Sequence, residues 1–338
     1  MVEFIELINF DILIASFQRP LVLKSCLDSI SSNSLQNLTK TIILVLENDI
    51  ESINLINSPK YQSLNIASAL ASDIPHPGLS RNMLIKQATS PYLFFMDDDA
   101  SLPVDYFDTA REIIKNEKPM IFGGPDQYKE KSEIRQILIG ELLKNKFVMG
   151  PTFKRHFKSN NIQDANETNL TLCNLWIQKS IFSKYNIYFD EEVKRCEENL
   201  LIESFLQKGV NASYYGDLFV YHLRRTSLFE TFKIQLSSGF ARGICFHKDA
   251  RTFKPFFLIP FLTGVLLLIG PIFFKNLMFF LILAHTLYNT YISYKSTFYV
   301  KRINLLPYSL MFIILVHIGF SVGLVFGVVK GFIKCKKS

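Results

Sequence analysis

The stretch YLFFMDDDASLP, residues 92–103, joins five apolar or aromatic residues directly to three carboxylates. The apolar run is typical of a buried β-strand, and Asp97, Asp98 and Asp99 follow it where such a strand would end. Three adjacent like charges repel one another, and none of them enters an apolar core without a partner. We therefore expect a partner of opposite charge at this strand end.

The segments around this stretch indicate an α/β fold. Apolar runs typical of buried strands occur at 10–17, 41–46 and 64–71, and helical spacing occurs at 21–30 and 81–88. Strands that alternate with helices predict a parallel, doubly wound sheet, in which ligands bind beyond the carboxyl ends of the strands. Polar clusters occur at three such ends, at 16–19, 47–49 and 97–99.

Adjacent carboxylates at a strand end suit a hard divalent cation, Mg²⁺ or Mn²⁺. Such ions prefer oxygen ligands and are often held by one or two carboxylates together with substrate phosphates. A bound cation would relieve the repulsion among the three aspartates. The alternative that these residues alone leave open is a solvated acidic loop.

The charge of the chain is unevenly distributed. Residues 240–338 hold 12 Lys and Arg against one acid, Asp249, which leaves 25 bases and 29 acids in 1–239. The pI near 9.0 therefore does not indicate a nucleic-acid partner; the positive charge flanks apolar segments and suggests an anionic membrane surface. The five scattered cysteines favour reduced thiols, and the N-terminus shows no signal-peptide pattern.

Three segments in the last third are uncharged and about as long as a bilayer crossing requires: 255–274, 276–294 and 303–329. They predict a multi-pass protein of the inner membrane with a cytoplasmic catalytic domain, with two full spans and one interfacial or re-entrant segment. The predicted division is a domain at 1–245, a basic linker at 246–254, membrane segments within 255–330 and a basic tail at 331–338. Glycines at four-residue spacing, Gly319, Gly323 and Gly327, predict a close-packing helix face that suits a homo-oligomer.

The ordered set IASFQRP, VLEND, GLSRN, FFMDDDASLP, GGPD, CNLWIQKSIF, FDEEVKRCEENLL, VYHLRR and GFARG resembles family 2 glycosyltransferases. The resemblance covers about 10–243. It implies a GT-A fold, which is a Rossmann-like mixed sheet that binds a nucleotide-diphosphate sugar, followed here by membrane helices. It also implies a hexosyltransferase that uses Mn²⁺ or Mg²⁺ and passes the sugar of a nucleotide sugar, here a UDP-sugar, to a lipid-linked or glycan acceptor.

The resemblance also implies roles for individual residues on the donor side. Residues expected to contact the nucleotide are Ser16, Phe17, Arg19, Glu47, Arg81, Asp97 and Asp98. Glu47 stands where the family usually has Asp, and Asp98 receives no defined role. The expected metal ligands are Asp97, Asp99 and His222.

On the acceptor side, the CEENLL stretch resembles the family's ED motif. It implies that Glu198, with Glu197 beside it, deprotonates the acceptor hydroxyl, so that direct displacement inverts the anomeric carbon. Residues expected near the diphosphate or acceptor are Gly124, Asn174, Trp176 and Arg225. Burial of Trp176 in the core is equally consistent with its sequence.

Two other functions remain open from the sequence. Asp97-x-Asp99-x-Ser101 after an apolar strand is close to the motif of haloacid-dehalogenase phosphohydrolases, in which Asp97 would be the nucleophile. A membrane-anchored protein that binds a sugar nucleotide without catalysis is the third hypothesis, because Glu47 and Glu198 replace aspartates.

Overall fold

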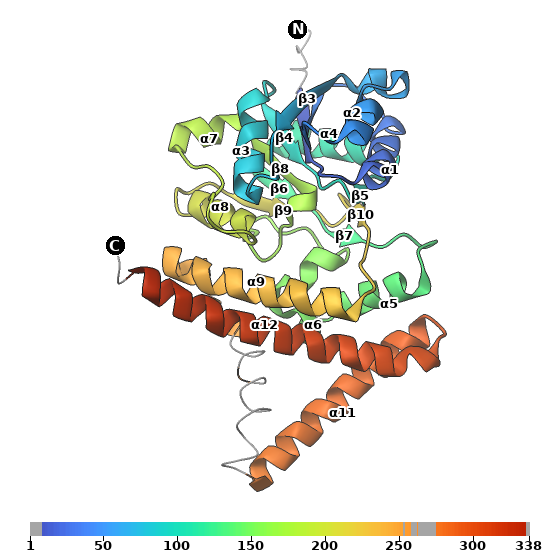
Figure 1. Ribbon diagram of the computed structural model, residues 1–338, viewed down its shortest axis with the longest axis vertical. Helices are drawn as coiled ribbons and strands as arrows, with labels where there is room; N and C mark the ends of the chain where they lie inside the picture. Colours follow the sequence, from blue (N-terminus) through green and yellow to red (C-terminus); the bar gives the residue numbers. More distant parts are fainter. Residues whose placement is uncertain (1–8, 253, 258–261, 263–274, 336–338) are drawn as a thin grey trace. The chain divides into compact units, whose positions relative to one another are not determined.

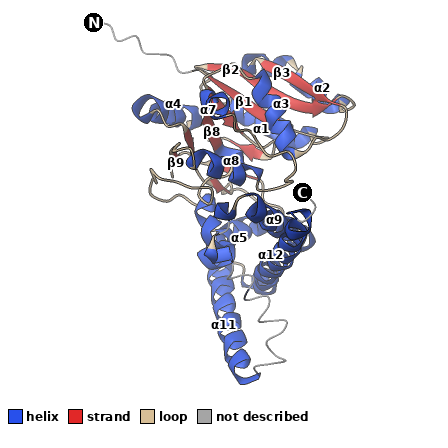
Figure 2. Ribbon diagram, turned by 90° about the vertical axis from the view of Figure 1, so that its left-hand side faces the viewer, coloured by secondary structure: helices blue, strands red, loops and turns tan. Residues whose placement is uncertain are grey.

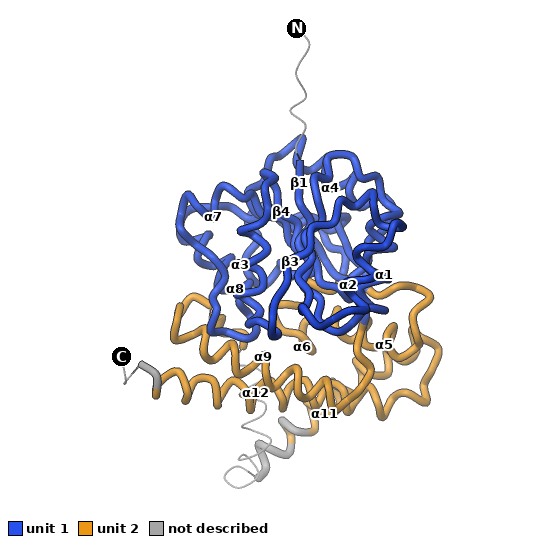
Figure 3. Tube along the Cα trace, turned by 45° about the horizontal axis from the view of Figure 1, so that its top comes forward, with its two compact units in different colours: residues 1–127, 157–223 blue, residues 128–156, 224–338 orange. Residues whose placement is uncertain are grey.

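The computed structural model describes residues 9–252, 254–257, 262 and 275–335. The chain divides into two compact units (Figure 3): the first comprises 1–127 and 157–223, and the second comprises 128–156 and 224–338. This division differs from the predicted domain at 1–245, because residues 128–156 and 224–245 group with the C-terminal helices.

The first unit is built on a seven-stranded sheet with strand order β3-β2-β1-β4-β8-β6-β9. Its strands are β1 (Phe10–Ala15), β2 (Leu38–Leu46), β3 (Ile66–Ala71), β4 (Tyr92–Phe95), β6 (Ile121–Gly123), β8 (Leu175–Gln178) and β9 (Ala212–Tyr214). β8 runs antiparallel to β4 and β6, whereas the other neighbours are parallel. The predicted α/β fold with a mixed sheet is therefore confirmed.

Helices cover both faces of this sheet (Figures 1 and 2). One face carries α1 (Pro20–Ser31), α2 (Ile50–Ile56), the 3₁₀ helix Pro59–Leu64 and α4 (Tyr106–Glu117). The other face carries α3 (Pro77–Gln87), α7 (Lys179–Tyr185) and α8 (Glu197–Leu206). The short strands β5 (Ala100–Ser101), β7 (Asp126–Gln127) and β10 (Val220–His222) form a second sheet, in the order β5-β10-β7, and a 3₁₀ turn, Leu172–Asn174, precedes β8.

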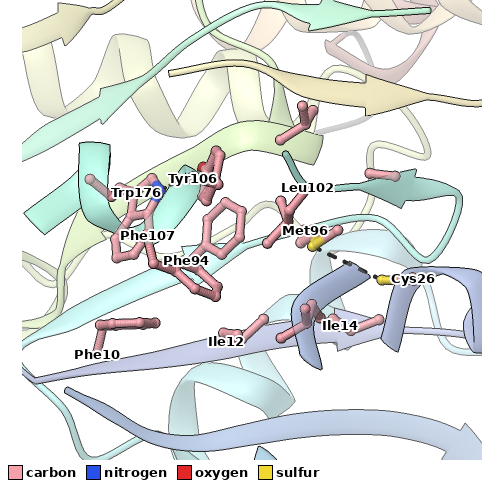
Figure 4. Packing of buried hydrophobic residues seen from close by; sticks show 14 of the residues in the cluster. Phe10, Ile12, Ile14, Cys26, Phe94, Met96, Leu102, Tyr106, Phe107 and Trp176 are labelled. Atoms are coloured by element: carbon pink, nitrogen blue, oxygen red, sulfur yellow. Dashed lines mark hydrogen bonds between the residues drawn. The ribbon is translucent and has the colours of Figure 1, made fainter. Parts of the chain in front are cut away.

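An aromatic cluster fixes β4, the strand that precedes the three aspartates (Figure 4). Phe94 stacks on Trp176 with ring centroids 4.7 Å apart, and Phe122 stacks on the same indole at 5.4 Å. The indole Nε1 donates a hydrogen bond to the Tyr106 hydroxyl at 2.9 Å, so its buried polar atom is satisfied. The strand that leads to the aspartates is thus held by rigid packing.

The second unit is helical. Its helices are α5 (Ile134–Leu143), α6 (Lys146–Met149), α9 (Leu228–Lys248), α11 (Lys275–Tyr299) and α12 (Leu306–Cys335), with 3₁₀ turns at Gly150–His156, Ala250–Thr252, Pro255–Phe257 and Ile303–Leu305. The apolar side of α5 packs against Ile292 of α11 and Phe312 of α12 in one cluster. This packing explains why 128–156 belongs with the C-terminal helices.

The glycine face of α12 is occupied by α9 of the same chain. A Cβ added at Gly323 would lie 2.0 Å from the Leu236 carbonyl oxygen, and one at Gly327 would lie 2.1 Å from that of Phe240. Only glycine permits this approach of two backbones. The prediction that this face mediates a homo-oligomer is therefore corrected: the face is used within the chain.

Among the described residues, one helix, Ile303–Ile333, has the length and apolar composition that a membrane crossing requires. The predicted segment 276–294 lies within α11, which does not meet both requirements over the residues described. The predicted segment 255–274 falls mostly outside the described residues. A multi-pass arrangement is thus not supported by the described helices.

Candidate active site

The chain turns directly after β4, and this turn separates the three aspartates. The Ala100 amide donates to the Asp97 carbonyl at 3.1 Å, and Ala100 then pairs with His222 in the β5–β10 ladder. That pairing brings the imidazole Nε2 of His222 within 3.0 Å of Asp99 Oδ1. Short-range turn geometry and one strand pair therefore bring together residues that are far apart in the chain.

Asp98 is the buried member of the triplet, with 4% of its surface exposed. Its carboxylate accepts hydrogen bonds from the Ser16 hydroxyl at 2.7 Å and from Arg19 at 2.8 Å. Arg19 also donates to Asp99 at 3.0 Å. The sequence left Asp98 without a role, whereas the structure makes it the anchor of the loop that follows β1.

Asp97 and Asp99 are only partly buried, and with His222 they form a cluster that could hold a metal ion. One ligand atom from each of the three lies within 4.8 Å of the others. Two carboxylates and an imidazole are a donor set suited to Mn²⁺, and carboxylate oxygens also suit Mg²⁺. The predicted ligands therefore lie together, and their donor atoms fit the expected cation.

The surroundings give the three carboxyls different proton affinities. Burial raises the pKa of Asp97, although the charge of Arg81 opposes the shift. Burial likewise raises the pKa of Asp98 to about 6 against the opposing effects of Ser16 and Arg19. Burial also acts to raise the pKa of Asp99, but its hydrogen bonds and charge attraction with His222 and Arg19 outweigh this effect and leave it below its usual value.

Arg81 lies between the aspartate turn and the start of α8. Its guanidinium is 3.5 Å from Asp97 and 3.7 Å from Glu197, and it donates to the Pro77 carbonyl at 3.0 Å. Glu197 is 4% exposed. Burial, together with the charge of Glu198, raises the pKa of Glu197 to about 7, whereas Arg81 acts in the opposite direction.

Glu198 differs from its neighbour because it is partly exposed, in the first turn of α8. The helix begins after Cys196, which has a positive φ of 63°. Carboxylates in a first turn are favoured by the helix dipole. Of the two glutamates, Glu198 is the more exposed.

The other predicted donor residues follow β1 and β2. Phe17 is half-buried, and Gln18 has a positive φ of 56°. The Gln18 amide donates to the Asp49 carboxylate at 2.8 Å, and the same carboxylate caps α2 through the Ser52 amide. Glu47 is exposed directly after β2, and its contact with the nucleotide stays a prediction.

Two predicted acceptor residues have structural roles instead. Trp176 and Asn174 are both 0% exposed. Asn174 donates to the Leu218 carbonyl at 2.7 Å and also hydrogen-bonds Tyr106, while Trp176 is stacked in the core. The prediction that these side chains meet the acceptor is therefore corrected, because neither can be reached.

Two of the residues predicted near the diphosphate or acceptor remain, Gly124 and Arg225. A Cβ at Gly124 would lie 1.9 Å from the Leu218 carbonyl oxygen, so a tight backbone approach already accounts for this glycine. Arg225 is exposed and belongs to the second unit, so its contact with the diphosphate stays a prediction.

Sequence reasoning missed the residues that hold these groups in place. Asn82 exchanges hydrogen bonds with the backbone of Phe189 and donates to Glu191 at 2.8 Å. A Cβ at Gly78 would lie 2.0 Å from the Asp190 carbonyl oxygen. In GLSRN, Gly78 and Asn82 therefore dock α3, which carries Arg81. Asp49, with Ser52 three residues later, had a recognisable N-cap pattern.

The mixed sheet, with carboxylates, two arginines and a histidine gathered after its strands, fits the GT-A fold. The family model described as Glycosyl transferase family 2 matches residues 11–185, more than half of the chain. The chain belongs to this family and is a glycosyltransferase. This finding replaces the phosphohydrolase hypothesis. No curated protein matched the sequence.

Solved structures give the same fold. The mannosyltransferase PcManGT from Pyrobaculum calidifontis, in complex with GDP-Man and Mn²⁺, matches with a TM-score of 0.62 at 11% identity, over 96% of this chain and 87% of that one. S. aureus TarS 1–349 in complex with UDP-GlcNAc matches with a TM-score of 0.51 at 13% identity, over 94% and 90%. This chain spans 38% of the longer TarS chain. At these identities the likeness shows the fold alone.

Proposed function

We propose that this protein is an inverting, metal-dependent glycosyltransferase that uses a nucleotide-diphosphate sugar, with a UDP-sugar as the preferred donor. The observation that carries the proposal is the convergence of Asp97, Asp99 and His222 beside Arg19 and Arg81. Three groups able to ligate a cation and two fixed guanidinium groups suit a diphosphate. PcManGT, a member of the same fold class, was solved with GDP-Man and Mn²⁺, which supports the choice of donor class and ion.

Each residue of the site has a distinct task in the proposed reaction. Asp97, Asp99 and His222 would hold Mn²⁺ or Mg²⁺, which supplies charge neutralisation for the diphosphate as it leaves. Ser16, Phe17, Arg19, Glu47 and Arg81 would receive the nucleotide, and Asp98 would hold Ser16 and Arg19 in position.

Glu198 is the proposed general base. It accepts the proton of the acceptor hydroxyl while that oxygen attacks the anomeric carbon and the bond to the diphosphate breaks. A single base with attack opposite the leaving group inverts the anomeric configuration. The exposure of Glu198 favours it over Glu197, which is buried beside Arg81.

The acceptor proposed is a lipid-linked or growing glycan at the inner membrane face, in cell-surface polysaccharide synthesis. The apolar helix Ile303–Ile333 and the excess of basic residues after 240 support a site of action at a membrane.

The test is a panel of UDP-, GDP- and dTDP-sugars with Mn²⁺, Mg²⁺ or EDTA, in which donor hydrolysis and transfer to lipid-extract acceptors are measured. The proposal expects metal-dependent release of the nucleoside diphosphate and a product of inverted anomeric configuration by NMR. Donor binding without turnover across the panel would favour a non-catalytic sugar-nucleotide-binding protein, and a retained configuration would contradict the single-base mechanism.

A further inference from the structure

The helix that could cross a membrane, α12, is tied along its length to a charged helix of its own unit. Successive glycines of α12 lie against successive turns of α9: Gly319 is next to Phe232, Gly323 to Leu236 and Gly327 to Phe240. The two helices therefore run parallel and in contact over several turns. If the second half of α12 crossed a bilayer, α9 would have to cross with it.

α9 is unsuited to hydrocarbon. It carries Glu230, Lys233, Arg242 and Lys248 within 21 residues. Arg242 is 3% exposed, and its guanidinium donates to the Thr252 carbonyl at 3.1 Å, so it cannot extend to a distant headgroup. Ionised side chains are costly in the bilayer centre, and α9 carries four residues of this kind within its 21 residues.

The first half of α12 is similarly tied to elements with charge. Phe312 and Val316 pack on Leu138 of α5, and the His317 ring hydrogen-bonds the Phe147 carbonyl at 3.0 Å. Tyr308 lies under the guanidinium of Arg135, 5.3 Å from the ring centroid. Both halves of α12 therefore have protein, rather than lipid, along one side.

The opposite face of α12 is apolar and exposed. Met311 and Ile314 in its first half, and Val325, Val329 and Ile333 in its second half, fall on one side at helical spacing, and each is at least 38% exposed. This outer stripe extends over about 33 Å at 1.5 Å per residue. Exposed apolar side chains at both ends of one helix, as these described residues are, mark an interaction site.

The charges near this helix indicate what covers the stripe. Lys301 and Arg302 precede α12 and are exposed, Lys330 is exposed within its last turns, and Lys334, Lys336 and Lys337 follow in the sequence. An apolar stripe with basic residues at both ends complements the acyl chains and the anionic headgroups of a lipid surface.

We propose that α12 does not cross the membrane but lies in the plane of an anionic bilayer surface, paired with α9, with its outer stripe inserted among the lipids. The proposal rests on the membrane placement in the proposed function and specifies its geometry. It requires the start and the end of α12 to lie on the same side of the bilayer.

The first experiment is vesicle flotation of the full chain with phosphatidylcholine vesicles, with and without phosphatidylglycerol. We expect binding that strengthens with the anionic lipid, and a loss of about tenfold or more for Val325→Glu combined with Val329→Glu. The matched control is Val104→Glu, an exposed valine of the first unit, which should bind like the unaltered protein. The milder pair Val325→Ser and Val329→Ser, with a melting curve in detergent, separates lost insertion from lost folding.

The second experiment distinguishes a helix α12 that lies in the membrane plane from one that crosses the bilayer. An impermeant maleimide is applied to sealed membrane vesicles of one orientation. In the Cys196→Ser variant it reports on native Cys335 at the end of α12. In a variant with Arg302→Cys, Cys335→Ser and Cys196→Ser it reports on position 302, before the start of α12. The proposal expects both positions to be labelled from the same side; labelling from opposite sides overturns it.

The outcomes also separate this inference from the proposed function. If the unaltered protein does not bind vesicles but forms a dimer that the two glutamates disrupt, the stripe is covered by a second copy and the proposal fails. Metal-dependent donor hydrolysis, measured on the same preparations, reports on the catalytic proposal independently of either result.

Discussion

The two units of this chain carry charge in opposite ways. The first gathers five carboxylates, Asp97, Asp98, Asp99, Glu197 and Glu198, around one strand end and one helix start, with Arg19, Arg81 and His222 between them. Residues 224–338 of the second hold 15 Lys and Arg against Glu230 and Asp249, distributed along a mostly apolar stretch of sequence. Concentrated charge needs fixed geometry and suits one small ligand, whereas distributed charge on apolar helices suits a broad surface.

The largest expected effect concerns the carboxylates gathered in the first unit. Glu198→Gln keeps the size of the side chain and removes the proposed base, so turnover should fall about 10²- to 10⁴-fold while donor binding persists. The measurements are transfer rate and nucleotide affinity by calorimetry. Near-normal turnover would move the base elsewhere, and Glu197→Gln would then be the next variant to measure.

Asp98→Asn tests whether the buried aspartate positions the donor loop. The carboxylate that accepts from Ser16 and Arg19 would be lost, and we expect about 10- to 100-fold weaker donor binding, because a hydrogen bond to a charged group contributes roughly 1.5–3 kcal/mol. Asp217→Asn, at an exposed aspartate of the same unit, is the control. Equal donor affinity in both variants would show that the loop does not depend on Asp98.

The second unit should instead be sensitive to added volume. Gly323→Ala puts a methyl group where the Leu236 carbonyl lies, and it should cost about 1–3 kcal/mol of unfolding free energy as strain. Val325→Ala, on the exposed side of the same helix, should change stability much less. Melting curves in detergent provide the measurement, and equal midpoints would mean that the α9–α12 contact is not tight.

Some of these differences between the two units could be predicted from the sequence, and others could not. The strand that ends in the aspartates was predictable, because an apolar run that stops at three carboxylates is typical of a buried strand that reaches the edge of its sheet. The cluster of Asp97, Asp99 and His222 was expected from the family resemblance. The roles of Asp98 and Trp176 depend on which way each side chain points after a turn or along a strand, and no local pattern encodes that.

The helices of the second unit show more clearly what the sequence does not predict. The glycines of α12 predict close packing, and α9, far earlier in the sequence, has matching glycines, Gly239 and Gly243, that meet the α12 backbone. No local pattern pairs the two helices with each other. An apolar segment of membrane length has the same composition whether it crosses lipid or packs on a charged helix. Which element packs on a helix face is decided by the tertiary structure, and the sequence of the helix alone does not predict it.

The smallest expected effect concerns a surface ion pair of the first unit. Asp28 accepts from Lys24 at 2.8 Å, from Tyr61 at 2.7 Å and from Lys60, and these contacts, led by that with Lys24, hold its pKa below the usual range. A depressed folded-state pKa contributes stability above the unfolded value, near 3.9, and loses it as the pH falls. Asp28→Asn should therefore cost only about 0.5 kcal/mol at neutral pH, because the carboxylate is partly exposed, and less under acid conditions. Chemical unfolding at two pH values checks this, and a cost that grows under acid conditions would contradict it.

The central claim is that the aspartate turn is a metal-dependent donor site. The most direct measurement is Mn²⁺ and UDP binding by calorimetry to the unaltered protein and to Asp99→Ala, with Asp217→Ala as the control. We predict that UDP binds tightly only with Mn²⁺, and that Asp99→Ala loses the Mn²⁺-dependent part by more than about 100-fold while the control retains it. Unchanged Mn²⁺-dependent binding in Asp99→Ala would contradict the account.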